Sequence, residues 1–462
     1  METSTREPCG GCERLQAELD ALQAEMAELR EQLATARKTS STSSKPPSSD
    51  IVKAKPAENA DGSKRTIGGQ LGHPKHDREP FPAEQVTLFA EHTLDACPCC
   101  GGPLQRNAHF AKVVQQIDIV KPPLVIEQHT SPEYWCVQCE KSYKARMPSH
   151  IETGGLVGIE LTALIAFMKG VCHASFSTTR TFLRDVAGVT ISRSELSKIL
   201  GKVSAALETP YEELLQLLPN EPNVNADETG HKDNGDLWWT WCFRAELYTL
   251  YHIDPHRSAD VLMNILGTEF KGILGCDYFS AYRRYMRVCS VRLQFCLAHL
   301  IRDIKFLTTL PDARDRRYGE DLRAAVKDLF LVIHQREPLG EGEFQVRLEA
   351  ARDRMLRIGK LGPPTQHGQN MEKRFREHGA AYFTFVTTPG VEPTNNLAEQ
   401  AIRFVVIDRH ITQGTRSEKG RQWSERIWTV IATCAKQGKS VYTFLREAVG
   451  NWFEGEPAPS LL

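Results

Sequence analysis

The chain has 462 residues, too many for one ordinary hydrophobic core, so we expect two to four folding units. Its 57 Lys and Arg against 58 Asp and Glu exclude a uniformly basic surface, so any surface that binds a polyanion must be local. The polar N-terminus lacks the order of a signal peptide, and Glu160 and Lys169 interrupt the most apolar run. We therefore expect a cytoplasmic protein without a membrane segment, whose thirteen Cys serve metal binding or burial rather than disulfides.

The first predicted element is a helix within residues 1–38 with an apolar residue at alternating spacings of four and three. The residues of this seam are Leu15, Leu19, Leu22, Met26, Leu29 and Leu33. Such an a/d pattern is typical of a coiled coil, and a helix this short needs a partner to bury the seam. We favour a dimerising coiled coil; the alternative is an amphipathic helix docked on its own chain. Residues 39–93 are rich in Ser, Pro and Lys and predict a flexible linker.

Two pairs of cysteines, each separated by two residues, characterise the segment 94–148. The pairs are Cys97 with Cys100 and Cys136 with Cys139. A tight turn brings each pair of thiolates to one metal ion, so together they predict a structural Zn²⁺ site with four ligands. The alternative is buried or turn cysteines without metal, and Cys99 inside the first pair leaves the register open. The intervening "VVQQIDIV" and "LVIEQHT" alternate like β-strands.

Residues 149–221 show helical periodicity. Within them, "STTRTFLRDVAGVTISRSELSKIL" predicts two short helices joined through "AGVTIS", which suits a helix-turn-helix that binds DNA. A generic helical hairpin has the same pattern, so the sequence leaves this choice open.

The pattern changes to strands after Pro222. "NVNADETG", "LWWTWCFRA" and "LYTLYHID" predict a three-stranded meander, and "SADVLMNILG" predicts a helix capped by Ser258. A strand, a helix and another strand leading into a helix follow, which is the order of a ribonuclease-H-like α/β domain. We divide it into a first part at 222–310, a helical insertion at 311–380, a second part at 381–453 and a tail at 454–462.

Two aspartates mark expected strand ends in this domain. Asp227 stands where the first strand should end, and Asp277 ends the fourth strand, while Glu228 should face away from Asp227 because strand side chains alternate. Turn or cap chemistry is the alternative for each aspartate taken singly. Acids that converge from separate elements are what phosphodiester chemistry with two divalent ions requires.

Glu399 in "EPTNNLAEQAIRF" is the third candidate acid. With Asn396 as N-cap it occupies the third helical position, where a capping box would use it. If Glu399 binds metal instead, Asn395 or Asn396 would cap the helix alone.

Taken together, these motifs make the chain resemble transposases of the insertion sequence 66 family, which are bacterial DDE enzymes. "SSKPPSSD" and "GGQLGH" resemble the linker signatures of that family, "CPCCGG" with "WCVQC" its zinc-binding domain, and the leucine seam its N-terminal zipper. "NADETG", "GCDYFSAY" and "NNLAEQAIR" resemble its three catalytic blocks, and "CLAHLIRDI" resembles the block after its fifth strand.

The resemblance implies a DDE transposase in which Asp227, Asp277 and Glu399 are catalytic acids that hold Mg²⁺ or Mn²⁺. It implies Zn²⁺ at Cys97, Cys100, Cys136 and Cys139, and as partners the transposon ends, target DNA, further copies of the chain and accessory proteins of the element. The location would then be the nucleoid. Two alternatives remain: a nuclease or resolvase without strand transfer, or an inactive DNA-binding protein.

Three further residues have weaker interpretations. Arg403, one turn beyond Glu399, is a candidate phosphate contact or a surface arginine. His299 and Arg302 follow the fifth strand, where they would face DNA or take a packed or solvated role.

Overall fold

The computed structural model describes residues 10–36, 38, 81–86, 88–89, 96, 99–100, 102–103, 124–138 and 140–462. The chain forms two compact units, one of residues 1–52, 128–185 and 189–462 and the other of residues 53–127 and 186–188. In the second unit the described secondary structure is one short 3₁₀ helix, η2 (Ala83–Gln85). Most of the predicted linker, and the strand predicted over 113–120, lie outside the described residues.

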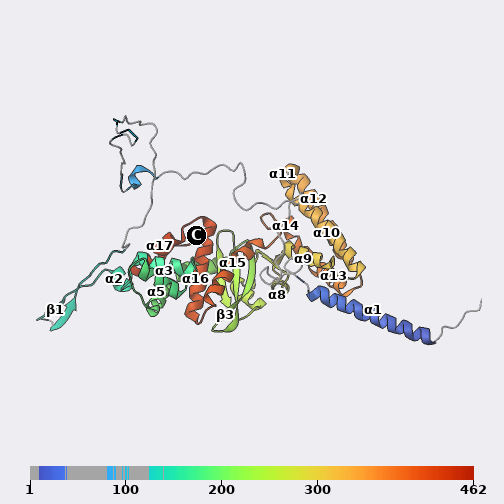
Figure 1. Ribbon diagram of the computed structural model, residues 1–462, viewed down its shortest axis with the longest axis horizontal. Helices are drawn as coiled ribbons and strands as arrows, with labels where there is room; N and C mark the ends of the chain where they lie inside the picture. Colours follow the sequence, from blue (N-terminus) through green and yellow to red (C-terminus); the bar gives the residue numbers. More distant parts are fainter. Residues whose placement is uncertain are drawn as a thin grey trace, which may run out of the picture. The chain divides into compact units, whose positions relative to one another are not determined.

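A five-stranded sheet lies at the centre of the first unit (Figure 1). Its strands stand in the order β5-β4-β3-β6-β7, with β4 antiparallel to both of its neighbours, β3 and β5, and with β6 and β7 parallel to β3. The strands are β3 (Asn223–Asp233), β4 (Asp236–Arg244), β5 (Thr249–Asp254), β6 (Ile273–Cys276) and β7 (Arg292–Phe295). Helix α7 (Ala259–Leu266) connects β5 to β6, and α8 (Ser280–Cys289) connects β6 to β7. The predicted order of strands and helices is confirmed.

Local sequence explains where these elements begin and turn. Asn234 and Gly235 join β3 to β4 with φ angles of 52° and 98°, the left-handed pair that a tight hairpin prefers. Ser258 caps α7 as predicted, because its side chain accepts a hydrogen bond from the Asp260 backbone N–H. All four residues of β6 are buried, as a parallel strand covered on both faces requires.

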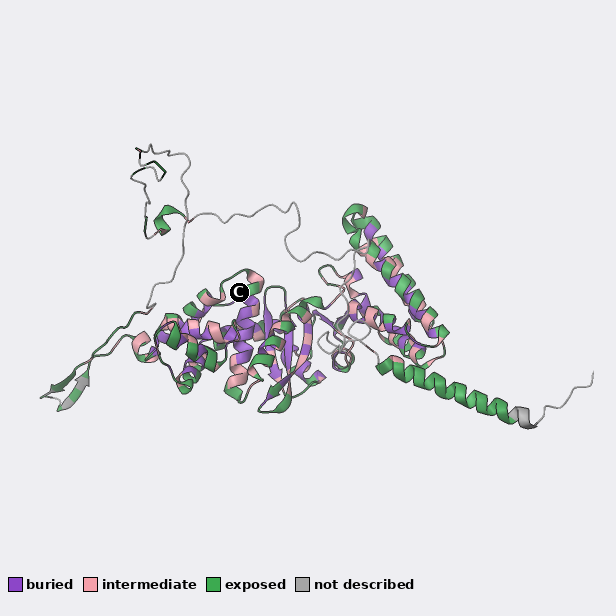
Figure 2. Cartoon of the chain, viewed as in Figure 1, coloured by how far each residue is buried: buried purple, intermediate pink, exposed green. Residues whose placement is uncertain are grey.

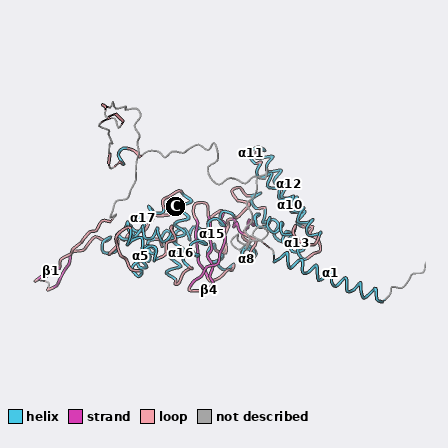
Figure 3. Tube along the Cα trace, in the orientation of Figure 1, coloured by secondary structure: helices cyan, strands magenta, loops and turns pink. Residues whose placement is uncertain are grey.

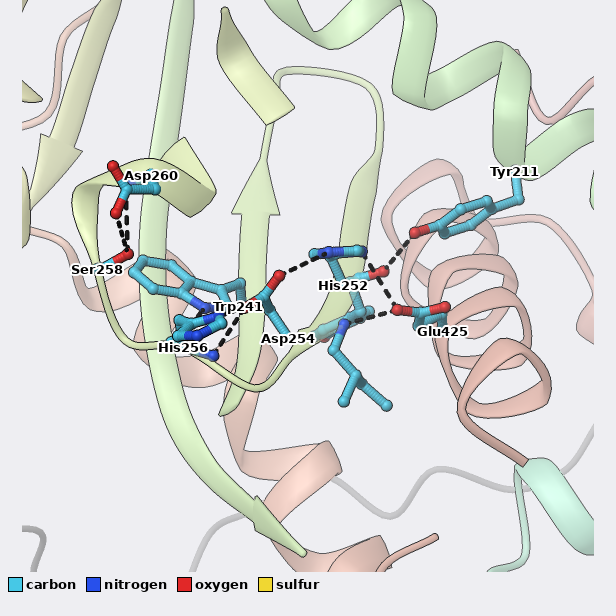
Figure 4. A network of polar contacts seen from close by, with 10 residues as sticks. Tyr211, Trp241, His252, Asp254, His256, Ser258, Asp260 and Glu425 are labelled. Carbon is cyan, nitrogen blue, oxygen red and sulfur yellow. Dashed lines mark hydrogen bonds and ion pairs between the residues drawn. The ribbon is translucent and has the colours of Figure 1, made fainter. Parts of the chain in front are cut away.

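Helix α16 (Glu418–Gln437) covers the β5 edge of the sheet through side chains one turn apart. The backbone N–H groups of Thr249, Tyr251 and Ile253 donate to Thr433 Oγ1, Thr429 Oγ1 and Glu425 Oε1 at 3.2, 3.1 and 2.6 Å. Figure 4 shows the last of these, where Glu425 also contacts His252. Every second residue of β5 thus contacts every fourth residue of α16. The helix side chains accept from backbone N–H groups that the edge strand would otherwise leave unpaired.

Helices make up most of the described chain (Figure 3). One group precedes the sheet: α2 (Ser149–Gly154), α3 (Ile159–Gly170), α4 (Phe176–Asp185), α5 (Arg193–Ala206), α6 (Glu208–Leu217) and η4 (Leu218–Asn220). The C-terminal helix α17 (Val441–Glu454), which falls within the predicted second part of the core, packs against α2, α3 and α5. The two helices predicted around "AGVTIS" are α4 and α5.

The stretch Ser149–Gly170 is apolar and long enough to cross a membrane by length and composition alone. This is weak evidence, because the core helix of a globular protein passes the same test. In this chain α2 ends at Gly154 before α3 begins at Ile159, and α3 packs against α5 and α17. These contacts favour the core helix that the sequence predicted.

A second helical group stands between β7 and the helix that carries Glu399. It consists of α9 (Leu297–Leu307), α10 (Ala313–His334), α11 (Arg336–Leu339), α12 (Glu341–Gly359), α13 (Gln366–His378), η5 (Gly379–Tyr382) and α14 (Thr384–Thr387). The Tyr318 hydroxyl on α10 donates to the Gly359 carbonyl at the end of α12, which ties the two longest helices of the group together. Helix α15 (Asn396–Thr412) then returns to the sheet and contacts β3.

The N-terminal helix α1 (Gly10–Ala36) is present, and its seam is exposed (Figure 2). Whether it pairs with a second copy stays a prediction. Cys136, the first residue of the second cysteine pair, ends β1 (Glu133–Cys136), which forms a hairpin with β2 (Lys141–Lys144). The strand predicted for "LVIEQHT" is wrong: residues 124–130 form no strand in the described chain, and Val125 and Ile126 are exposed. An alternating pattern produces a strand only where a neighbouring strand pairs with it.

Candidate active site

Asp227 lies in the middle of β3, six residues before the strand ends at Asp233. The prediction that the strand ends at Asp227 is therefore wrong. The reason is that β4 pairs with β3 up to Asp233, whereas the parallel partner β6 pairs only with residues 223–225. Asp227 still lies just beyond the parallel part of the sheet, and one of its carboxylate oxygens accepts a hydrogen bond from the Glu228 backbone N–H at 3.0 Å.

Asp277 directly follows the last residue of β6, as predicted. Its Oδ1 accepts a hydrogen bond from the Phe279 backbone N–H at 2.9 Å, which fixes the carboxylate where the chain turns into α8. Because β6 runs parallel to β3, Asp277 and Asp227 lie at the same edge of the sheet.

Glu399 lies in the first turn of α15, at the fourth helical position rather than the third. The helix begins at Asn396, so Asn395 stands at the N-cap, and its side chain makes no capping hydrogen bond. The predicted Asn396 cap and capping box are therefore wrong. Asn395, one of the two residues predicted to cap the helix alone, holds the N-cap position without a capping hydrogen bond. The physical reason is that Asn395 binds β3 instead.

Asn395 is buried and joins three parts of the site. Its side-chain N–H donates to the Ala226 carbonyl at 2.7 Å, and its side-chain oxygen accepts from the Asn225 amide at 2.9 Å. Its backbone N–H donates to Cys296 Sγ at 3.1 Å. A Cβ at Gly275 on β6 would clash with the Asn225 amide, so glycine makes room for this link. The start of α15 is thereby fixed to the strand that carries Asp227.

The other two candidate acids influence Asp227 electrostatically. Surrounding protein removes most of the water from Asp227, and this burial raises its pKa well above the usual range. The carboxylates of Glu228, Asp277 and Glu399 raise the pKa of Asp227 further. Carboxylates that raise the pKa of one another make protonation favourable unless a cation joins them.

Glu228, the neighbouring acid, is already paired. Its Oε1 accepts hydrogen bonds from the Arg257 guanidinium at 2.9 and 2.6 Å, and its Oε2 accepts from the Tyr282 hydroxyl. The Arg257 guanidinium lies over the Phe279 ring, 3.9 Å from its centroid. These contacts leave Glu228 with its own cation and favour the three other acids as metal ligands.

Two side chains of helix α9 lie close to the Glu399 carboxylate. His299 Nδ1 lies 3.5 Å from Glu399 Oε1, and an Arg302 guanidinium nitrogen lies 3.8 Å from Glu399 Oε2. His299 is buried, so between the two predicted roles it takes the packed one, while Arg302 keeps 28% of its side chain exposed. Burial lowers the pKa of His299, while Glu399 and Asp277 act in the opposite direction.

Residues 154–423, more than half of the chain, match the family described as transposase IS66. The chain belongs to the IS66 transposase family. The matched segment contains the five-stranded sheet and the three candidate acids. Residues 6–79 match a family of unknown function, and a comparison with curated proteins gives no match.

The IS66 match extends to a zinc-binding segment. Residues 95–140 match the zinc-finger binding domain of transposase IS66, and this span contains all four predicted ligands. Cys97 and Cys139 lie outside the described residues, Cys136 ends β1, and Cys99 and Cys100 are exposed. The match supports structural zinc in this IS66-family protein, while the assignment of the ligands stays a prediction.

Several residues of the site had no signal in the sequence. The sequence predicts a cap at Asn395 or Asn396, and no pattern in it indicates that Arg257 and Tyr282 are partners of Glu228. Cys296 stood inside the "CLAHLIRDI" block without a role. Arg403 is exposed, as expected of either a phosphate contact or a surface arginine.

Proposed function

We propose that this IS66-family protein is a DDE transposase that binds the ends of an insertion sequence, cleaves DNA there and joins the 3′-hydroxyl ends to target DNA. Asp227, Asp277 and Glu399 would hold Mg²⁺ or Mn²⁺. The observation that carries the proposal is electrostatic: Asp277 and Glu399, from two other elements, both raise the pKa of Asp227.

The residues fit a divalent cation with oxygen ligands. Glu399 Oε1 is buried and has no hydrogen-bond partner among the described residues, so it is free to bind a cation. Asp227 and Asp277 each use one oxygen to accept a backbone N–H, which orients their carboxylates. Bound Mg²⁺ ions would activate the attacking oxygen and stabilise the leaving one.

The chain's own part in the reaction is to position these ligands. Asn395 fixes the first turn of α15 to β3, and this link holds Glu399 at a constant position relative to Asp227. Asp277 is held at the end of β6 by the turn into α8. Ligands that are already held in position lose little conformational entropy when a cation binds, because their side chains need not reorient.

We propose a ribonuclease-H-like fold for the sheet domain. The strand order β5-β4-β3-β6-β7, with β6 and β7 parallel to β3, supports it. The helices α10 to α13 would be the insertion that separates Glu399 from the aspartates.

We further propose that Cys97, Cys100, Cys136 and Cys139 bind one structural Zn²⁺. The hairpin that places Cys136 at the end of β1, immediately before a turn, supports a metal knuckle. Elemental analysis of the zinc-loaded protein should find one Zn²⁺ per chain fewer in Cys136→Ser than in the unchanged protein.

The decisive test is a strand-transfer assay with a DNA end and a target plasmid. Asp277→Ala and Glu399→Gln should abolish both cleavage and joining, whereas Asp236→Ala should leave both intact. Asp236 is a suitable control because it is an exposed acid on the same sheet. Normal strand transfer by Asp277→Ala would contradict the assignment, and cleavage without joined product in the unchanged protein would favour the nuclease alternative.

A further inference from the structure

Beside the three acids, α9 and its N-cap contribute a second set of metal-binding atoms. Cys296 Sγ, a ring nitrogen of His299 and a carboxylate oxygen of Glu399 all lie within 4.8 Å of one another. The transposase proposal uses Glu399 alone of these three. Cys296 and His299 are both buried, so a ligand bound here would be largely removed from water.

Two of these atoms lack the partners that buried polar atoms normally have. Neither His299 Nδ1 nor Glu399 Oε1 has a hydrogen-bond partner among the described residues, although both are buried. Such orphaned atoms call for a missing ligand, because buried polar groups are nearly always paired. The two atoms face each other, so one ligand can satisfy both.

The spacing of the two atoms fits a shared metal ion. They are 3.5 Å apart. Nitrogen and oxygen ligands bound at about 2.1 Å to a tetrahedral Zn²⁺ lie about 3.4 Å from each other. Cys296 Sγ is held in place by the Asn395 backbone N–H at 3.1 Å, and Arg302 approaches the other oxygen of Glu399.

We propose that Cys296, His299 and Glu399 form a separate site for a borderline divalent cation such as Zn²⁺. A thiolate and an imidazole favour Zn²⁺ over Mg²⁺, which requires oxygen ligands. On binding, the Cys296 thiol releases its proton to solvent and the thiolate takes the metal.

The site has a consequence for catalysis, which rests on the proposed function. Because Glu399 belongs to both sets, Zn²⁺ at Cys296 and His299 withdraws this carboxylate from the aspartates. Zn²⁺ bound there and Mg²⁺ bound at the acids therefore compete, and Zn²⁺ inhibits DNA cleavage.

A binding experiment tests the site without any activity. The full chain is saturated with Cd²⁺, a spectroscopic probe for zinc sites, and bound Cd²⁺ is counted by equilibrium dialysis and by the thiolate charge-transfer band. Cys296→Ser and His299→Ala should each bind one Cd²⁺ per chain fewer than the unchanged protein. Cys434→Ser, which removes a buried cysteine on α16, should bind the same number as the unchanged protein.

Equal Cd²⁺ stoichiometry in the unchanged protein, Cys296→Ser and His299→Ala would overturn the site. Two variants are used so that one misfolded variant does not decide the result, and thermal melting checks each. In a cleavage assay, Cys296→Ser should raise the Zn²⁺ concentration for half-inhibition at least tenfold. Failure of Mg²⁺-dependent cleavage in the unchanged protein would count against the transposase proposal alone, whereas cleavage that Zn²⁺ does not inhibit would overturn the competition.

Discussion

Two regions of the same sheet, the β5 edge and the site of the three acids, differ in whether their polar groups have hydrogen-bond partners. At the β5 edge, three backbone N–H groups donate to three side chains of α16, and Glu425 is buried with its partners. Beyond the parallel pairing of β3 with β6, Asp277 and Glu399 raise the pKa of Asp227, and buried atoms of Glu399 and His299 lack hydrogen-bond partners among the described residues. The first arrangement stabilises the fold, whereas the second costs stability and therefore indicates function.

The largest effect should come from the acids. Asp277→Asn keeps the acceptor for the Phe279 N–H but removes a charge that Asp227 faces. We expect DNA cleavage to fall by about a thousandfold or more, while the melting temperature of the metal-free protein rises because like charges no longer repel. A cleavage rate near that of the unchanged protein would break the comparison.

At the β5 edge the same kind of substitution should act in the opposite sense. Glu425→Ala leaves the Ile253 N–H and His252 without their buried partner. We expect a loss of about 2–3 kcal/mol of unfolding free energy, measured by denaturant titration, without a change in Mn²⁺ affinity. Glu418→Ala, at an exposed position of the same helix, is the matched control and should cost less than about 0.5 kcal/mol.

Gly275→Ala probes the link between the strands and α15. The added methyl group meets the Asn225 amide, which holds Asn395. We expect a loss of about 1–3 kcal/mol of stability from overpacking, together with weaker Mn²⁺ binding because Glu399 shifts. If stability falls and Mn²⁺ affinity does not, Asn395 does not position Glu399.

The β5 edge should also respond to pH through His252 (Figure 4). Burial acts to lower the pKa of His252, but the carboxylates of Asp254 and Glu425 beside the ring together raise it to about 9. Because the pKa is higher in the folded than in the unfolded protein, protonation of His252 stabilises the fold. This contribution is complete when the pH is below the unfolded pKa of about 6.5, and it is lost as the pH rises through about 9. The unchanged protein should exceed His252→Gln by roughly 2–3 kcal/mol at pH 6 and by little at pH 9.5. A difference independent of pH would show that His252 is not the titrating group.

The smallest structural effect should follow removal of residues 1–38. The leucine seam of α1 is exposed, with Leu15 68% and Leu33 48% accessible. Size-exclusion chromatography with light scattering should show a smaller oligomer after deletion, with an unchanged melting temperature for the sheet domain. An unchanged oligomer would contradict the coiled-coil prediction.

The succession of strands and helices along the chain and the position of Asp277 after its strand could be predicted, because strand periodicity and isolated acids are local signals. The position of Asp227 within β3 could not, because the length of β3 depends on its pairing with β4. The α16 ladder could not, since Glu425, Thr429 and Thr433 have a meaning only beside β5. Asn395 shows the same limit: its place just before a helical run predicts a cap, but its side-chain amide donates to a strand far upstream in the chain. Cys296 and His299 become candidate metal ligands only because the fold brings them close to Glu399 on α15, which the sequence does not reveal.

The central claim is that Asp227, Asp277 and Glu399 form one metal site. Mn²⁺ titration followed by electron paramagnetic resonance tests it directly on the unchanged protein, Asp227→Asn, Asp277→Asn, Glu399→Gln and the neighbouring Glu228→Gln. We expect the first three substitutions each to weaken Mn²⁺ binding, and Glu228→Gln to retain it because Glu228 is paired with Arg257. Unchanged Mn²⁺ affinity in any one of the first three variants would contradict the shared site.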